Sequence, residues 1–133
     1  MPRIVWRLQQ DRPSVQVVLT LTVDGQPLRR TLLADTGAGS AQTGVQLVLA
    51  EEDCLLCGGF AAGTGRLSGA YTGVFPIYVL LVQLPALGFE QYVRAVGLPA
   101  VPSGFDGIAC FSFLNRFTYG NFGDAGQFGL ETA

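Results

Sequence analysis

The chain has 133 residues, of which 49% are hydrophobic and 14% charged, with a net charge of −2 and no histidine. This length supports one domain, residues 1–133, with its own core, and the composition excludes intrinsic disorder. All eight basic residues are arginines and they form no run, so nucleic acid is not an expected partner.

The N-terminal segment lacks the apolar stretch of a secretory signal peptide. The longest apolar stretch, Val74 to Leu84, is interrupted by Pro76 and Gln83 and is too short to cross a bilayer. We therefore expect a cytoplasmic protein with no membrane partner.

Three cysteines are present: Cys54, Cys57 and Cys110. An odd number without a signal peptide argues against a disulfide framework. Cys54 and Cys57 have the spacing of half a zinc site, but without histidine the usual four ligands cannot be assembled. We expect small core residues, with no metal and no cofactor.

Most of the chain shows the alternating apolar runs and turn residues of β-structure. Strands are expected at Ile4–Leu8, Val15–Val23, Leu28–Ala34, Val74–Leu84 and Gln91–Val96. Asp24-Gly25 predicts a hairpin between the second and third strands. Arg29-Arg30 is interpreted as a solvated strand edge. Residues 45–56 fit either a strand or a short helix, with Glu51-Glu52-Asp53 suited to a solvated turn.

The glycine-rich segment Gly58–Gly73 predicts a β-hairpin with its tip near Gly63 to Arg66, although a plain mobile loop is an equal alternative. Its Gly-x-Gly is not a dinucleotide fingerprint, because no βαβ pattern surrounds it. Pro99–Gly104 is a turn-rich connection.

The C-terminal part predicts a short helix and a final hairpin. Ser112 is expected to cap a helix that carries Phe113, Leu114 and Phe117. Thr118–Phe122 and Gln127–Glu131 then flank Asp124-Ala125-Gly126 as a hairpin. The predicted fold class is mainly β: a closed, mostly antiparallel β-barrel with one short helix near the C-terminus.

One stretch points to chemistry. Leu32-Leu33-Ala34-Asp35-Thr36-Gly37-Ala38-Gly39-Ser40 is an apolar strand that ends in a carboxylate and turn-forming residues. A carboxylate at the end of a buried strand is costly unless it is satisfied. The alternative interpretation is an ordinary aspartate in a strand-ending turn.

This stretch resembles the catalytic loop of aspartic peptidases, and its small-residue tail is most similar to the retropepsin-like, retroviral-type family in its bacterial single-domain form. A second stretch, Asp106-Gly107-Ile108 followed by Phe113-Leu114, resembles the segment that packs behind that loop in the family. Cys110 stands where the family has a glycine.

The resemblance implies a retropepsin-type barrel that acts as a homodimeric aspartic endopeptidase on a peptide or protein substrate. Asp35 would be the catalytic carboxylate of each subunit, Thr36 would brace the two loops, and Gly37 would allow close backbone approach. In the cleft, Ala38 would form the floor, and a covering flap would contain Thr64, Gly65 and Arg66, with Tyr71 as a further flap candidate.

The same resemblance implies that Ile4–Leu8 and Gln127–Glu131 contribute to a sheet shared by two subunits. The absence of histidine argues against a Ser-His or Cys-His apparatus within the chain. The alternative function is a catalytically inactive dimerisation or peptide-binding module on the same fold, which would tolerate Asp35→Asn.

Overall fold

Strands make up 49% of the computed structural model and helices 11%, and residues 1–69 and 71–132 are described. The mainly β class, the closed barrel and the short helix are therefore confirmed. In chain order the elements are β1 (Arg3–Arg7), β2 (Ser14–Thr20), β3 (Pro27–Ala34), β4 (Leu47–Ala50), α1 (Glu51–Gly58), β5 (Gly63–Leu67), β6 (Gly73–Leu84), the 3₁₀ turn η1 (Pro85–Leu87), β7 (Phe89–Leu98), β8 (Gly107–Ala109), α2 (Phe111–Leu114), β9 (Thr118–Gly120) and β10 (Gln127–Glu131).

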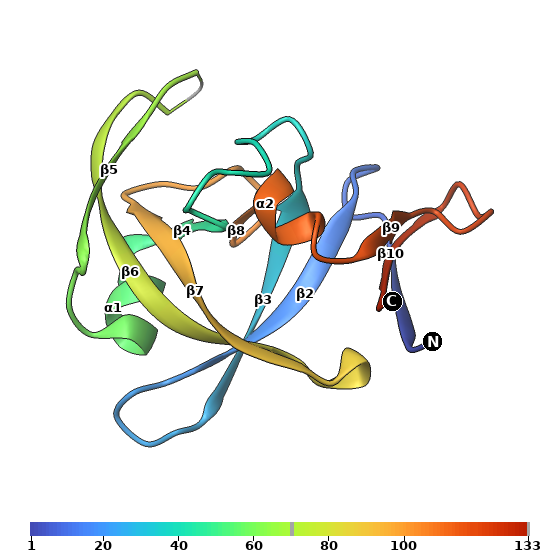
Figure 1. Cartoon of the computed structure of the whole chain (residues 1–133), viewed down its shortest axis with the longest axis horizontal. Coiled ribbons are helices and arrows are strands. Elements are labelled where there is room, and N and C mark those ends of the chain that lie inside the picture. The colour runs from blue at the N-terminus through green and yellow to red at the C-terminus, as the bar shows by residue number, and fades with distance from the viewer. Residues whose placement is uncertain (70, 133) are drawn as a thin grey trace.

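Six strands close into a barrel in the order β2-β3-β8-β4-β7-β6, and β6 returns to β2 through the pairs Val18–Gln83 and Leu19–Val82. β5 extends β6 beyond the barrel as a hairpin arm (Figure 1). The β3–β8 and β4–β7 pairings are parallel and the others are antiparallel. The short strand β8 thus separates β3 from β4, although those two strands follow each other in the chain.

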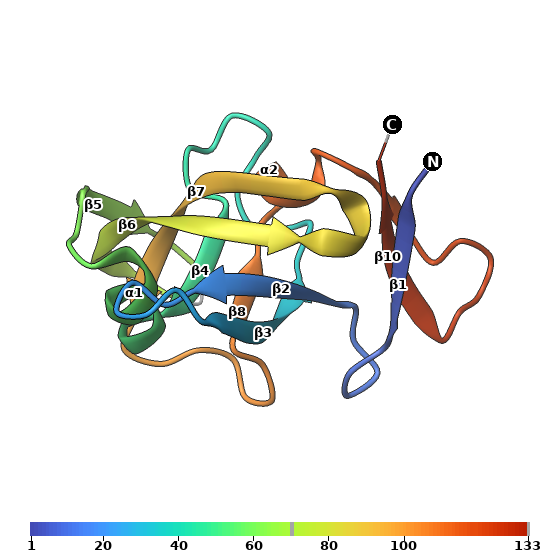
Figure 2. The ribbon, with the colours of Figure 1, turned by 90° about the horizontal axis from the view of Figure 1, so that it is seen from below.

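The two ends of the described chain meet in a second sheet of order β1-β10-β9. This terminal sheet stands beside the barrel, with both ends of the chain close together (Figure 2). Thr132 N–H donates to the Pro2 carbonyl at 3.1 Å. The predicted final hairpin is confirmed by the β9–β10 pairing.

The core follows from the strand periodicity. In β2 the alternate residues Val15, Val17 and Leu19 are fully buried while Gln16 is exposed. At one end of the barrel Phe89, Phe113 and Phe117 form an aromatic cluster with ring centroids 5.3–5.9 Å apart, so Phe113 and Phe117 are packing residues, as expected, whereas Phe111 is only half-buried.

The prediction for residues 45–56 resolves into both alternatives, strand β4 followed by helix α1. The acidic triplet is not a solvated turn, because it forms the first turn of α1 and Asp53 is buried. Arg30 is not a solvated edge residue either: its Nε and Nη2 donate to the two Asp53 carboxylate oxygens at 2.7 and 3.0 Å. A buried carboxylate needs such a partner, and sequence periodicity does not reveal it.

Three further boundaries differ from the prediction. β2 ends at Thr20, before the predicted Val23, and β7 spans ten residues where a short strand was expected. Helix α2 begins after Cys110, so Ser112 is not its cap. The Ser112 hydroxyl instead donates to the Val45 carbonyl at 2.9 Å.

The predicted β5–β6 hairpin is present, but the predicted position of its tip is wrong. Gly63 pairs with Ile77 and Leu67 with Gly73, which leaves residues 68–72 as the tip, Ala70 lying outside the described residues. The earlier glycines therefore belong to a paired strand.

All three cysteines are buried and unpaired, as expected of core residues. Burial raises the pKa of the Cys54 thiol to about 12 and also raises that of Cys57. Across the described residues, no helix is long and apolar enough to cross a membrane.

Candidate active site

Asp35 lies where β3 leaves the barrel. Its N–H donates to the Ala109 carbonyl at 3.0 Å and so continues the β3–β8 pairing by one residue. The chain then turns sharply: Gly37 N–H donates to Asp35 Oδ1 at 3.0 Å, and Ala38 N–H donates to the Asp35 carbonyl at 3.2 Å. The half-buried carboxylate is thereby held by its own loop, and a Cβ at Gly37 would lie 3.3 Å from Asp35 Oδ1.

The second stretch lies directly behind this loop, as predicted. Phe111 N–H donates to the Ala38 carbonyl at 2.9 Å. Asp106 and Thr31 exchange two bonds, one from the Thr31 N–H to the Asp106 carboxylate at 2.9 Å and one from the Asp106 N–H to the Thr31 carbonyl at 2.8 Å. The second stretch is therefore hydrogen-bonded to the chain on both sides of Asp35, at Thr31 before it and at Ala38 after it.

Gly107 is required at this position. A Cβ there would lie 2.1 Å from the Val48 carbonyl oxygen, a contact that real Cβ atoms do not make. The glycine lets β8 fit between β3 and β4. Because Asp35 directly follows β3, the packing of β8 against β3 also sets the position of Asp35.

A cleft of about 380 Å³ lies between the Asp35 loop and the β5–β6 hairpin. Its walls come from the loop, from β4, from the hairpin tip and from β8. The lining residues are Asp35, Gly37, Ala38, Gly39, Thr43, Val45, Val48, Leu67, Ser68, Gly69, Tyr71, Ile108 and Cys110. Among these described lining residues Asp35 is the one carboxylate and no side chain is basic, so its charge faces mainly apolar and hydroxyl groups.

The structure brings some of the predicted site residues together and not others. Asp35, Gly37 and Ala38 line the cleft, whereas Thr36 is exposed beside it. Thr64, Gly65 and Arg66 lie within β5 and outside the cleft lining.

The hairpin residues that do line the cleft are Leu67, Ser68, Gly69 and the flap candidate Tyr71, of which the first three were not predicted. The signal for these residues was present in the sequence: small turn-forming Ser68-Gly69 stands between two large apolar side chains. Tyr71 and Leu67 pack on a second cluster of buried residues that includes Val48 and Ile108, which ties the hairpin tip to the cleft wall.

Cys110 forms part of that wall and is 5% exposed. Burial, with a smaller effect of the Asp35 charge, raises the pKa of its thiol to about 12. The thiol is therefore neutral near pH 7 and acts as an apolar wall group, since nucleophilic reactions of cysteine need the thiolate.

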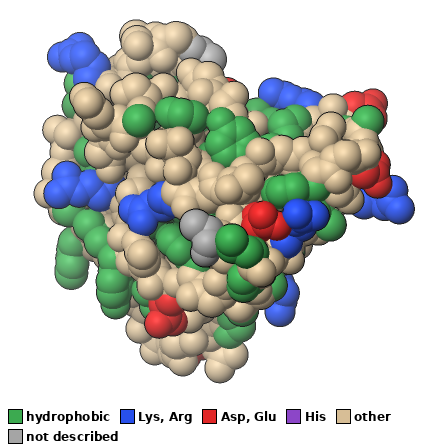
Figure 3. All heavy atoms as spheres, turned by 45° about the vertical axis from the view of Figure 1, so that its right-hand side comes forward, with side chains coloured by type: hydrophobic (Ala, Val, Ile, Leu, Met, Phe, Trp, Pro, Cys, Tyr) green, Lys and Arg blue, Asp and Glu red, His purple; other side chains and the backbone are tan. Residues whose placement is uncertain are grey.

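Other chemistries have less support in the described part of the chain. There, no group of three or more His, Cys, Asp or Glu side chains is placed to hold a metal ion. On the face shown in Figure 3 the arginine side chains stand apart from one another, without one basic patch.

Comparisons with protein-family models, with curated proteins and with solved structures find no match for this chain.

Proposed function

We propose that this chain is a retropepsin-like aspartic endopeptidase that acts as a homodimer. The observation that carries the proposal is the Asp35 carboxylate at the mouth of a barrel strand, held by its own Asp-Thr-Gly loop and facing a cleft beneath a β-hairpin. The closed barrel and the glycine-rich hairpin agree with the resemblance seen in the sequence.

The chemistry requires two carboxylates that face one water molecule. Two such groups at close range share a proton, so that one acts as general base toward the water and the other donates to the substrate carbonyl. The described lining of the cleft supplies one, Asp35. A second copy related by a two-fold axis supplies the other, and hydrolysis then proceeds without a covalent intermediate.

The mainly apolar cleft supports an extended peptide as the substrate. Val45, Val48 and Ile108 offer contact to apolar side chains on either side of the bond to be cleaved. The predicted flap residues lie in strand β5, outside the cleft lining. Thr64, Gly65 and Arg66 would therefore affect the substrate only by setting the position of the hairpin.

The terminal sheet is the proposed subunit interface. Within one chain β1 already pairs with β10 from Arg3–Glu131 to Arg7–Gln127, so a sheet shared by two subunits would form through the outer edge of β1 or β9. Open strand edges are ready templates for such pairing.

The test is cleavage of a diverse peptide library between acidic and neutral pH. We expect a bell-shaped pH profile, because the shared proton is needed, and a specific activity that rises with protein concentration, because the dimer is the active species. Asp35→Asn is expected to abolish turnover, while Asp11→Asn, at an exposed turn residue with φ of 59°, keeps it.

Two outcomes would overturn the proposal. Absence of cleavage by the wild type throughout this pH range, with Asp35→Asn identical to it in peptide binding, would favour the non-catalytic binding module. Activity that is retained in Asp35→Asn would place the catalytic group elsewhere.

A further inference from the structure

Helix α1 is packed with its large apolar side chains outward. Its buried residues are Asp53, Cys54 and Cys57, whereas Leu55 and Leu56 are 51% and 44% exposed. A helix on a barrel usually buries its leucines and exposes its charges. The arrangement in α1 therefore leaves an apolar surface that no other described residue covers.

Two further exposed apolar residues adjoin this helix. Val23, 84% exposed, follows Thr22, whose N–H and hydroxyl both donate to the Leu56 carbonyl at 3.0 Å. Phe60, 92% exposed, follows the end of the helix, and its N–H donates to the Gly58 carbonyl at 3.0 Å. We call Val23, Glu51, Glu52, Leu55, Leu56 and Phe60 the outer α1 surface.

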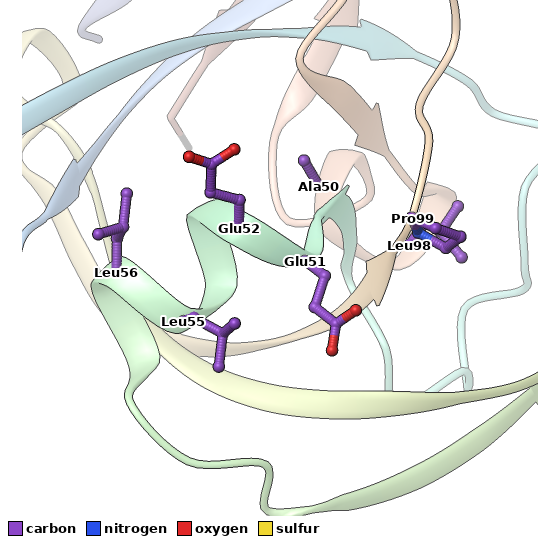
Figure 4. A pocket seen from close by; sticks show the side chains of 7 residues that line it. All are labelled: Ala50, Glu51, Glu52, Leu55, Leu56, Leu98 and Pro99. Atoms are coloured by element: carbon purple, nitrogen blue, oxygen red, sulfur yellow. The ribbon is translucent and has the colours of Figure 1, made fainter.

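This surface is hollowed. A shallow depression of about 520 Å³ runs between α1 and the end of β7, where Leu98 and Pro99 form the opposite wall. Figure 4 shows Glu51 and Leu55 on one side of the helix and Glu52 and Leu56 on the other, so that each leucine has a carboxylate one turn away. None of the lining residues belongs to the Asp35 cleft.

The negative charge of the depression indicates which kind of molecule could bind there. Its described lining holds two carboxylates and no basic side chain. A membrane with anionic lipids would be repelled by Glu51 and Glu52, whereas a polypeptide with Arg or Lys beside apolar residues would match both features. Carboxylates in the first helical turn also favour the helix itself, but that effect does not explain two exposed leucines.

We propose that the outer α1 surface docks a segment of a partner protein that is apolar and carries basic residues next to its apolar side chains. The site is separate from the Asp35 cleft and does not depend on the peptidase proposal. It would bring the partner to the barrel wall on which α1 packs.

The experiment uses the 133-residue chain with the substitution Asp35→Asn, so that no probe is cleaved. The probe is a fluorescent amphipathic peptide of about 15 residues with leucines on one face flanked by arginines. Matched peptides carry glutamates for the arginines or serines for the leucines. Anisotropy at two salt concentrations gives the affinities, and amide NMR shifts locate the bound peptide.

We expect the leucine–arginine peptide to bind at least about tenfold more tightly than either matched peptide, and to bind more weakly at high salt. Leu55→Ser/Leu56→Ser should lose this binding while keeping the native circular dichroism spectrum, because both side chains are exposed. The control Val74→Ser/Tyr92→Ser removes apolar groups of β6 and β7 that are at least as exposed, at 55% and 70%, and should bind as the parent chain does.

Three results would overturn the proposal: binding unchanged in Leu55→Ser/Leu56→Ser, equal binding of the glutamate peptide, or amide shifts confined to the Asp35 cleft. Sedimentation that shows a dimer lost in Leu55→Ser/Leu56→Ser would also overturn it, in favour of a second copy as the occupant. Vesicle binding by the same surface would overturn it in favour of a membrane.

Discussion

Replacement of Asp53 by Asn tests the least predictable contact in the fold. Asp53 on α1 and Arg30 on β3 form a bidentate pair, with Nε–Oδ2 at 2.7 Å and Nη2–Oδ1 at 3.0 Å. The side chains are 10% and 27% exposed. The bonds to Asp53 raise the pKa of the Arg30 guanidinium above its usual value. A guanidinium remains protonated even without such a partner, so the asparagine variant leaves a charged Arg30 without its counter-ion.

The cost follows from that stranded charge. Removal of one partner of a fully buried pair costs about 3–5 kcal/mol. Arg30 keeps about a quarter of its side chain in water, which relieves part of the penalty. We expect Asp53→Asn to lower the free energy of unfolding by about 2–3 kcal/mol, and the melting temperature by roughly 6–12 °C.

Urea unfolding followed by circular dichroism measures this loss. Glu52→Gln, at the exposed neighbouring position, is the control and should stay within about 0.5 kcal/mol of the wild type. The double variant Arg30→Met/Asp53→Leu should recover most of the loss, because it removes both desolvated charges. An Asp53→Asn variant as stable as the control would refute the reasoning.

The other predictions concern β8, the thiols and α2. Gly107→Ala should cost more than about 2 kcal/mol, because the added Cβ would lie 2.1 Å from a β4 carbonyl oxygen, whereas Gly63→Ala, with nothing within 4 Å, should not; equal urea midpoints would contradict this. The pKa values of Cys54 and Cys110 are raised from 9.0 to about 12, so their contribution to stability is fully present below pH 9 and is lost as pH rises toward 12. Unfolding midpoints should therefore fall above pH 9, and less so in Cys54→Ala and Cys110→Ala; parallel curves for all three proteins would contradict this. Ser112→Ala should lower stability by about 1 kcal/mol, measured by thermal unfolding, and no change would show that its hydrogen bond is replaced by water.

Periodicity and turn residues were enough to predict most of the barrel. The alternation in β2 and the Asp24-Gly25 turn gave the first hairpin, with Gly25 at a φ of 74°. The proximity of Asp35 and the Asp106-Gly107-Ile108 stretch also followed from the sequence, although through family resemblance and not through periodicity.

The contacts that sequence reasoning missed are long-range and polar. Arg30 and Asp53 are 23 residues apart, and Ser112 and Val45 are 67 apart. A charged or hydroxyl side chain is normally at the surface. Only the folded structure shows where a hydrogen-bonding or oppositely charged partner offsets the free-energy cost of burying such a group. The hairpin tip was missed for another reason, since many glycines in one segment leave the register of a strand weakly specified.

The insertion of β8 between β3 and β4 has a consequence for how the protein is made. The segment that joins β3 to β4 connects two strands that do not pair with each other, so that part of the barrel wall lacks a strand until residues 107–109 arrive. Contacts between residues so distant in the chain form slowly, and during synthesis most of the polypeptide emerges before its wall can close. Because Ile108 and Cys110 form part of its lining, the Asp35 cleft is completed only after most of the chain has been synthesised.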